Sequence, residues 1–147
     1  MIIWISGSIN SGKSSIGKLL AKNIANTAFV EVDDLREFID WMPLDKAIPL
    51  NLENAVSVIG NFVKNGLNVV VAYPLSQKNY DLVNPQLTEF KSKVFYFILN
   101  PGLESVVTNR GERELSSEEI ERIKYHYLIN LNNPEFGIKI NNTNQTI

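Results

Sequence analysis

Short, uniformly apolar segments alternate along the chain with segments whose apolar residues recur at helical spacing. The apolar runs at 1–6, 28–32, 67–73 and 93–99 show little polar alternation, as is typical of strands that are covered on both faces. A last short strand is predicted at 136–140. This alternation predicts an α/β fold, with a five-stranded parallel sheet and helices on both faces.

Helices are predicted between these strands, at 12–25, 33–42, 52–66, 79–89 and 102–110 and again after Ser116. Pro43 is expected to close the second of them. Asp34 and Glu37 have the spacing of a capping box, with Asp34 as the N-cap residue. Ser116 and Glu119 form a second box of this kind.

The amino-acid composition excludes some classes of chemistry and partner, but it does not identify a function. The 147 residues fit one domain, 1–147, with 44% hydrophobic residues and a net charge of −2. The absence of cysteine excludes disulfides, thiolate metal sites and a thiol nucleophile. No basic stripe favours a nucleic-acid partner, and no apolar run approaches the roughly 18 residues of a membrane span. We therefore expect a soluble, cytoplasmic protein without a membrane partner, and nucleic acid is an unlikely ligand.

One motif carries chemistry. Residues 7–15 read GSINSGKSS and fit the phosphate-binding pattern G-x-x-x-x-G-K-[ST] in full. A predicted strand precedes the motif and a predicted helix follows it, so backbone N–H groups and the helix dipole would face a phosphate chain. Lys13 would place its charge on the β and γ phosphates, and the Ser14 hydroxyl would bind magnesium. The predicted nucleotide contacts are Gly7, Ser8, Ile9, Asn10, Ser11, Gly12, Lys13, Ser14 and Ser15.

Other motifs of phosphate-loop proteins are missing. A GTPase would need N-K-x-D after a strand, but the residues after 93–99 read NPGLES. A motor or transporter ATPase usually has an acid at the end of a hydrophobic strand, where this chain has Tyr73 with Pro74, and Asn100. The strand-end carboxylates are instead Glu31, Asp33 and Asp34, after the second strand.

The location of these acids matters because ligands of open parallel sheets bind at the carboxyl ends of the strands. A carboxylate there can accept the proton of an attacking hydroxyl or hold magnesium through water. The cap accounts for Asp34, which leaves Asp33 and Glu31 as the candidates. The alternative for both Asp33 and Glu31 is that they are solvent-exposed acids without a role in chemistry.

The stretch EVDDLR at 31–36 resembles a known family. It is similar to the D-G-D-N-L-R of adenylylsulfate kinases and to the D-D-x-R of phage polynucleotide kinase. Together with the phosphate loop, it makes the chain look like the small P-loop kinases grouped with shikimate kinase and adenylylsulfate kinase. The resemblance implies that Asp33 is the catalytic base, that Glu31 is the first acid of the D-x-D, and that Arg36 contacts the acceptor.

The same resemblance extends to a lid and an adenine-side loop. NPGLESVVTNRGER resembles the helix and lid of these kinases, with a short lid near 109–116. On that match Arg110 lies near the adenine, and Arg113 reaches the transferred phosphoryl group. INNTNQT at 140–146 resembles the loop beside the adenine, which makes Asn142 a nucleotide contact. A solvated connection between two helices is the alternative for 109–116.

These observations predict an ATP- and magnesium-dependent kinase. It would transfer the γ phosphate of ATP to a small hydroxyl-bearing acceptor, with Lys13, Asp33 and Arg113 in catalysis and Ser14, Glu31 and Asp33 near the metal. A kinase for the 5′-hydroxyl of nucleic acid or nucleotides and a non-catalytic ATP-binding protein are the alternatives. Tyr73, with the residues WMPL at 41–44, could line the acceptor pocket, although the core is the commoner place for such residues. His126, the only histidine, is assigned to the surface or interior of its helix, far from the motifs.

We predict that Lys13→Ala abolishes or severely weakens transfer and leaves the fold intact, because the point charge on the β and γ phosphates is lost. Turnover and melting temperature of the two proteins provide the measurement. Retained turnover would contradict the assignment of the phosphate loop.

Overall fold

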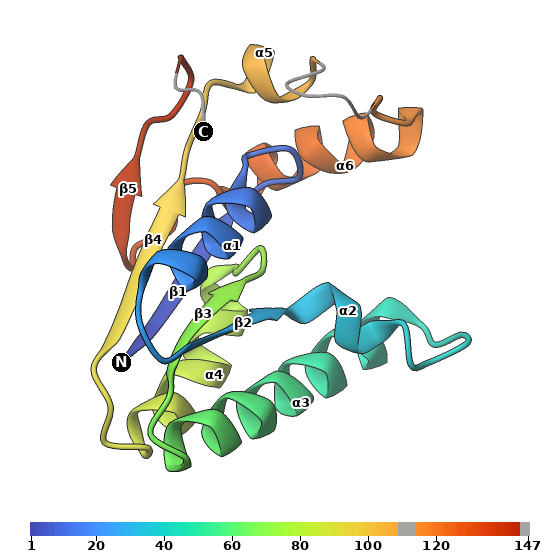
Figure 1. Ribbon diagram of the computed structural model, residues 1–147. Coiled ribbons are helices and arrows are strands. Elements are labelled where there is room, and N and C mark those ends of the chain that lie inside the picture. Colours follow the sequence, from blue (N-terminus) through green and yellow to red (C-terminus); the bar gives the residue numbers. More distant parts are fainter. Residues whose placement is uncertain (109–113, 145–147) are drawn as a thin grey trace.

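Five strands form one parallel sheet in the order β2-β3-β1-β4-β5 in the computed structural model, which describes residues 1–108 and 114–144 (Figure 1). The strands are β1 (Ile2–Gly7), β2 (Thr27–Glu31), β3 (Asn68–Ala72), β4 (Val94–Leu99) and β5 (Ile138–Ile140). The helices are α1 (Lys13–Asn23), α2 (Val32–Arg36), α3 (Leu44–Lys64), α4 (Gln77–Thr88), α5 (Leu103–Val106) and α6 (Ser117–Leu128). The predicted α/β class and the five-stranded parallel sheet are confirmed.

The central strand β1 pairs with β3 on one edge and with β4 on the other. Ile5 lies opposite Ala72 and Phe97, and the chain continues past Gly7 at the carboxyl edge of the sheet. β2 pairs with β3, with Glu31 opposite Ala72, so β2 ends at the same edge. The order therefore brings residues 7–15 and 31–36 to one edge, as the sequence analysis expected.

Helices cover both faces of the sheet. On one face, α3 and α4 pack against β1 and β3 through a core that includes Leu52, Ile59 and Leu87. On the other face, Ile16 and Leu20 of α1 pack against Ile3, Ile5 and Val70. β1 and β3 are thus buried on both sides, which explains their uninterrupted apolar sequence.

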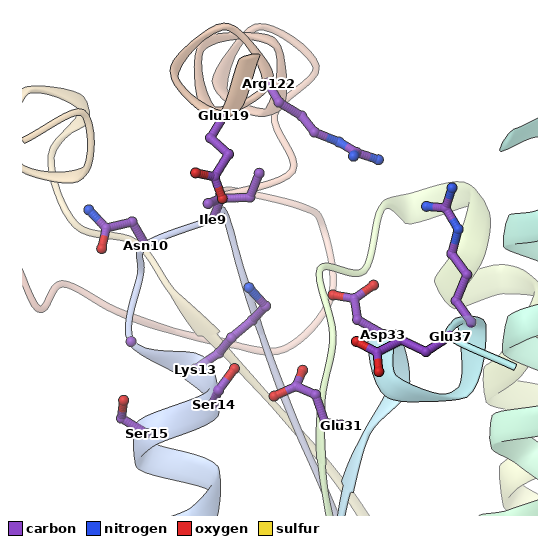
Figure 2. A pocket seen from close by; sticks show the side chains of 12 residues that line it. Ile9, Asn10, Lys13, Ser14, Ser15, Glu31, Asp33, Glu37, Glu119 and Arg122 are labelled. Atoms are coloured by element: carbon purple, nitrogen blue, oxygen red, sulfur yellow. The ribbon is translucent and has the colours of Figure 1, made fainter. Parts of the chain in front are cut away.

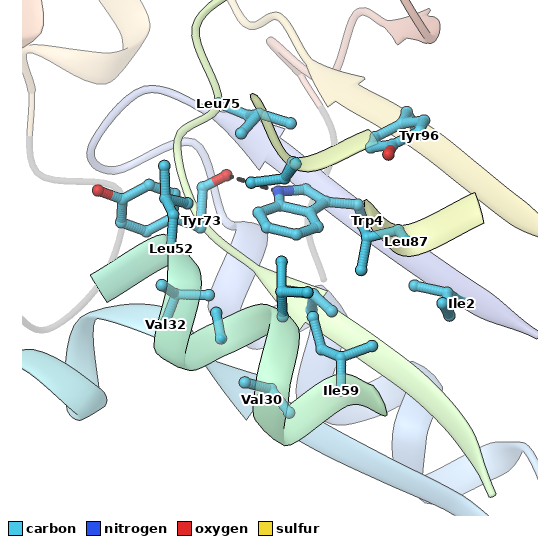
Figure 3. Packing of buried hydrophobic residues seen from close by; sticks show 14 of the residues in the cluster. Ile2, Trp4, Val30, Val32, Leu52, Ile59, Tyr73, Leu75, Leu87 and Tyr96 are labelled. Carbon is cyan, nitrogen blue, oxygen red and sulfur yellow. Dashed lines mark hydrogen bonds between the residues drawn. The ribbon is translucent and has the colours of Figure 1, made fainter. Parts of the chain in front are cut away.

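Trp4 anchors the larger core (Figure 3). It is fully buried, and its indole Nε1 donates a hydrogen bond of 3.2 Å to the backbone carbonyl of Tyr73. An aromatic group continues from it, with Tyr96 at 6.4 Å between ring centroids and Tyr80 stacked on Phe136 at 4.1 Å. The indole bond joins β1 to the chain just beyond β3, at the edge where the phosphate loop begins.

Two predicted helices have different bounds. The helix predicted at 33–42 is shorter than expected: it forms as α2, which begins directly after β2 and ends at Arg36. The helix predicted at 52–66 is longer than expected: it forms as α3, which begins at Leu44 and contains Pro49. Because β2 runs into α2 without a spacer, Asp34 lies inside the helix and Glu31 is the N-cap residue. The assignment of Asp34 as an N-cap is therefore wrong.

Other predicted elements are confirmed. Ser116 and Glu119 make both hydrogen bonds of a capping box at the start of α6, at 3.0 and 3.2 Å. The helix predicted at 79–89 forms as α4, with Ser76 as its N-cap. Among the helices of the described ranges, none has the length and hydropathy to cross a membrane.

We expect Trp4→Phe to lower the free energy of unfolding by about 2 kcal/mol, since it leaves a buried carbonyl without its donor and part of the core unfilled. Trp41→Phe is the matched control, because Trp41 is 79% exposed and such surface changes stay within about 0.5 kcal/mol. Urea unfolding of both variants tests this, and equal losses would contradict the role given to Trp4.

Candidate active site

The phosphate loop, defined here as residues 7–15, leaves β1 at Gly7 and enters α1 at Lys13. Gly12 has a φ of 94°, a left-handed conformation that favours glycine. A Cβ atom at Gly7 would lie 2.8 Å from the carbonyl oxygen of Leu99 and 2.7 Å from Ser11 Oγ. Both glycines of the motif are therefore required by backbone geometry, whatever the loop binds.

Side chains tie this loop to later parts of the chain. Asn10, at a φ of 62°, donates from Nδ2 to the carbonyl oxygens of Val106 and Thr108 at 2.9 and 2.8 Å. The Asn142 amide, which is buried, donates to the carbonyl oxygen of Ser11 at 2.8 Å. The structure thus places Asn142 against the phosphate loop, and its predicted contact with nucleotide stays a prediction.

His126 also reaches the phosphate loop, which corrects its assignment as a residue far from the motifs. Its Nδ1 lies 3.1 Å from the hydroxyl oxygen of Ser8, and both residues are buried. Burial and the positive charges of Arg122 and Lys13 lower the pKa of His126 to about 4. Near neutral pH the imidazole is therefore uncharged, and it packs α6 onto the loop.

A cavity of about 650 Å³ opens beside the loop (Figure 2). It brings together most of the residues that the sequence analysis singled out, from the phosphate loop, β2 and α2. Figure 2 shows Lys13, Glu31 and Asp33 directed toward the same space, with Arg122 and Glu119 of α6 on its far side. The lining residues are Ile9, Asn10, Gly12, Lys13, Ser14, Ser15, Glu31, Asp33, Arg36, Glu37, Glu119 and Arg122.

The acids of this cavity influence each other. Burial raises the pKa of Glu31, and the nearby carboxylates of Asp33 and Asp34 add to that effect. A hydrogen bond with Ser14 and the charge of Lys13 act in the opposite direction. The Ser14 hydroxyl and the Glu31 carboxylate therefore interact where the phosphate loop meets the end of β2.

These oxygens suit magnesium. Mg²⁺ prefers hard oxygen ligands and usually keeps several waters, with one or two carboxylates and the phosphates of its substrate. Ser14, Glu31 and Asp33 line one cavity and offer that donor set. Within the described residues there is no cluster of three or more acids or histidines that would form an all-protein metal cage. Ser14, Glu31 and Asp33 are thus the residues of this cavity whose oxygens could hold a magnesium ion.

A second cavity, of about 100 Å³, lies between α2, α3 and α6. Asp33, Arg36 and Tyr73 line it, as the predicted acceptor pocket required, and so do Asn51 and Arg122. Asn51 is buried, donates from Nδ2 to the carbonyl oxygen of Val32 at 2.9 Å, and leaves Oδ1 without a hydrogen-bond partner among the described residues. Burial, with a smaller contribution from Asp33, raises the pKa of Tyr73 to about 12, so its hydroxyl remains a donor.

Sequence reasoning missed Arg122, Glu119 and Asn51, and misplaced His126. Arg122 and His126 are four residues apart on α6, so they share one face of that helix. That spacing, directly after a capping box, was the available signal for a face turned toward the loop. Asn51 is an isolated polar position in an apolar stripe and gave no other signal.

Some predicted residues cannot be placed. Arg110 and Arg113 lie outside the described residues, so their roles and the lid itself stay predictions. The described part of that segment, 114–116, leads into the N-cap of α6.

No protein-family model matches the chain, and no curated protein matches its sequence. Solved structures do match its fold. A sugar kinase from Janibacter is 19% identical over 99% of this chain and 86% of its own, with a TM-score of 0.72. A gluconokinase from Sinorhizobium meliloti is 18% identical over 98% of this chain and 83% of its own, with a TM-score of 0.71.

The Pnkp1/Rnl/Hen1 RNA repair complex also contains a match, at 16% identity and a TM-score of 0.61. It covers 86% of this chain but only 45% of the matched chain, so this chain spans less than half of that protein. At these identities the matches establish that the fold is that of small P-loop kinases, as predicted, and leave the acceptor open.

We predict that the pH dependence of stability reports His126. The ordinary pKa is 6.5 and the folded value about 4, so between these values the unfolded chain takes up a proton that the folded chain does not. Stability should therefore fall as the pH falls from 6.5 to 4, and it should fall less in His126→Asn, which cannot titrate.

Urea unfolding at several pH values, with His126→Ala as a second variant, provides the measurement. Asparagine can also hydrogen-bond to Ser8, so we expect it to retain more nucleotide affinity than alanine does. Identical pH profiles of the wild type and both variants would contradict a buried, neutral imidazole at this position.

Proposed function

We propose that the protein is an ATP-dependent phosphotransferase that moves the γ phosphate to the hydroxyl of a small-molecule acceptor. One observation carries this proposal. A single cavity joins the phosphate loop, with Lys13 and Ser14, to the carboxylate of Asp33, which also lines the smaller cavity next to it. A nucleotide and an acceptor could therefore meet at Asp33.

Each residue has a distinct task in this proposal. Lys13 neutralises charge on the β and γ phosphates, and backbone N–H groups of the phosphate loop orient the chain of phosphates. Asp33 accepts the proton of the acceptor hydroxyl as that oxygen attacks the γ phosphorus. Arg122 lines both cavities and would neutralise the negative charge that develops during transfer, the role that the sequence analysis gave to Arg113.

The protein's oxygen ligands could hold a magnesium ion that comes with the nucleotide, and this ion would supply charge neutralisation at the phosphates. Ser14 would bind it directly, while Glu31 and Asp33 would hold its waters. Ser14 and Glu31 interact with each other, and both line the larger cavity.

The size and polarity of the second cavity support a small acceptor. It has a volume of about 100 Å³ and places Arg36, Tyr73 and Asn51 around Asp33. The net charge of −2 provides no general attraction for a polyanion, although one structural neighbour belongs to an RNA repair complex. A 5′-hydroxyl oligonucleotide therefore belongs in the acceptor panel beside sugars, sugar acids and nucleosides.

We expect Asp33→Asn to lower the transfer rate by about a hundredfold, the range of general acid–base catalysis, and to change ATP affinity little. Asp34→Asn is the matched control. It removes the same charge one residue away, but Asp34 is not among the residues that line either cavity. Calorimetric ATP affinity and transfer to the best acceptor of the panel are measured for both variants.

Three outcomes are informative. A larger loss in Asp34→Asn would shift the catalytic base by one position. Unchanged transfer in Asp33→Asn would remove the base altogether. Binding of ATP without transfer to any acceptor in the panel would favour the non-catalytic ATP-binding alternative.

A further inference from the structure

A third cavity lies beyond Arg36, on the side away from the phosphate loop. It has a volume of about 250 Å³ and is formed by the connection between α2 and α3 and by the first turn of α3. Its walls include Trp41, Met42, Leu44 and Ala47, with the carboxylate of Asp40 as its acid. The site described so far makes no use of this cavity.

The third cavity shares lining residues with the two cavities of the candidate active site. Arg36 lines all three cavities, and Ala47 lines both the second and the third. An acceptor that presents its hydroxyl to Asp33 in the second cavity can therefore extend past Arg36 and Ala47 into this one. A cavity of about 150 Å³ already accommodates benzene, so 250 Å³ is sufficient for a ring.

Trp41 lines this cavity and is not part of the core. Its side chain is 79% exposed, whereas the other tryptophan, Trp4, is fully buried. The sequence analysis favoured the core for residues 41–44, and that assignment is wrong for Trp41. A large aromatic surface at the mouth of a cavity can cover a ring face, and Asp40 can accept hydrogen bonds from donors at the edge of that ring.

We propose that this third cavity is a subsite for a ring of the acceptor, whose face packs on Trp41 and Met42 and whose hydroxyl or amino donors bond to Asp40. The inference rests on the proposed function, since the hydroxyl beside that ring is the one that faces Asp33. It narrows the acceptor class to cyclic compounds, such as a sugar in ring form or a nucleoside. Arg36, which lines all three cavities, would donate hydrogen bonds to a phosphate, carboxylate or hydroxyl carried next to the ring.

Three probes distinguish the sources of such a ring. Glucose offers a sugar ring, adenosine offers a base, and gluconate offers a comparable carbon chain that is open and carries a carboxylate. The full chain is first saturated with a non-hydrolysable ATP analogue and magnesium, and calorimetry records that binding separately. Each probe is then titrated, with calorimetry for affinity and with tryptophan fluorescence, in which Trp41→Ala separates the signal of Trp41 from that of Trp4.

We expect at least one ring probe to bind about tenfold more tightly than gluconate and to change the fluorescence of Trp41, as stacking on an aromatic face would. Trp41→Ala should lose about tenfold in affinity for that probe, and Trp41→Phe should retain most of it. Phe38→Ala is the matched control, because Phe38 is 87% exposed in the same connection and is not among the residues that line the cavity.

Several results would overturn the subsite. Gluconate could bind more tightly than both ring probes, or neither ring probe could bind. Trp41→Ala and Phe38→Ala could lower the affinity for a ring probe equally. Sedimentation could also show a dimer that Trp41→Ala dissociates. The last would assign Trp41 to a second copy of the chain. Failure of the ATP analogue to bind would instead refute the proposed function, so the two failures are distinguishable.

Discussion

Pairing of β1 on both of its edges is the constraint on which the site depends. β3 and β4 hold this strand through to Ile5 and Gly7, so the point where the chain leaves the sheet is determined by backbone hydrogen bonds. Gly7 then passes so close to the Leu99 carbonyl that a side chain would not fit. The turn into α1 follows, and the N–H groups at its start face the space where a phosphate would lie.

A loop of this kind has no regular ladder of backbone hydrogen bonds to hold it, and later parts of the chain stabilise it. Asn10 binds the carbonyls at the end of α5, Ser8 contacts His126 of α6, and Ser11 accepts from Asn142 after β5. The two helices that flank residues 109–116 are thus both attached to the phosphate loop. Any movement of the loop on nucleotide binding would be transmitted to both sides of that segment.

The acceptor side is organised by a short element. Because β2 passes into α2 without a spacer, Asp33 and Arg36 are held in one helix directly at the sheet edge. The early end of α2 leaves a connection of residues 37–43, and this places Trp41 in solvent beside Arg36. The bounds of α2 therefore fix the positions of two neighbouring features, the carboxylate of Asp33 and the exposed ring of Trp41.

The amino-acid sequence by itself determined the fold class, the parallel sheet, the phosphate loop and the strand-end acids. Those features depend on local patterns, such as apolar runs, helical spacing, and glycines at fixed separation. It did not determine the ends of α2 and α3, because Leu35, Phe38 and Ile39 have helical spacing although Phe38 ends in solvent. Propensity along a segment does not record which face the rest of the chain will cover.

Only the tertiary structure decided the partners of the loop and the composition of the acceptor side. His126 is 118 positions from Ser8, Asn142 is 131 positions from Ser11, and no local pattern links residues so far apart. Arg122 and Asn51 acquire a place near Asp33 through the packing of α6 and α3 around the sheet edge, and Trp41 acquires one near Arg36 through the α2–α3 connection. Such contacts result from the summed burial of many apolar side chains, so they become visible only once the whole core has formed.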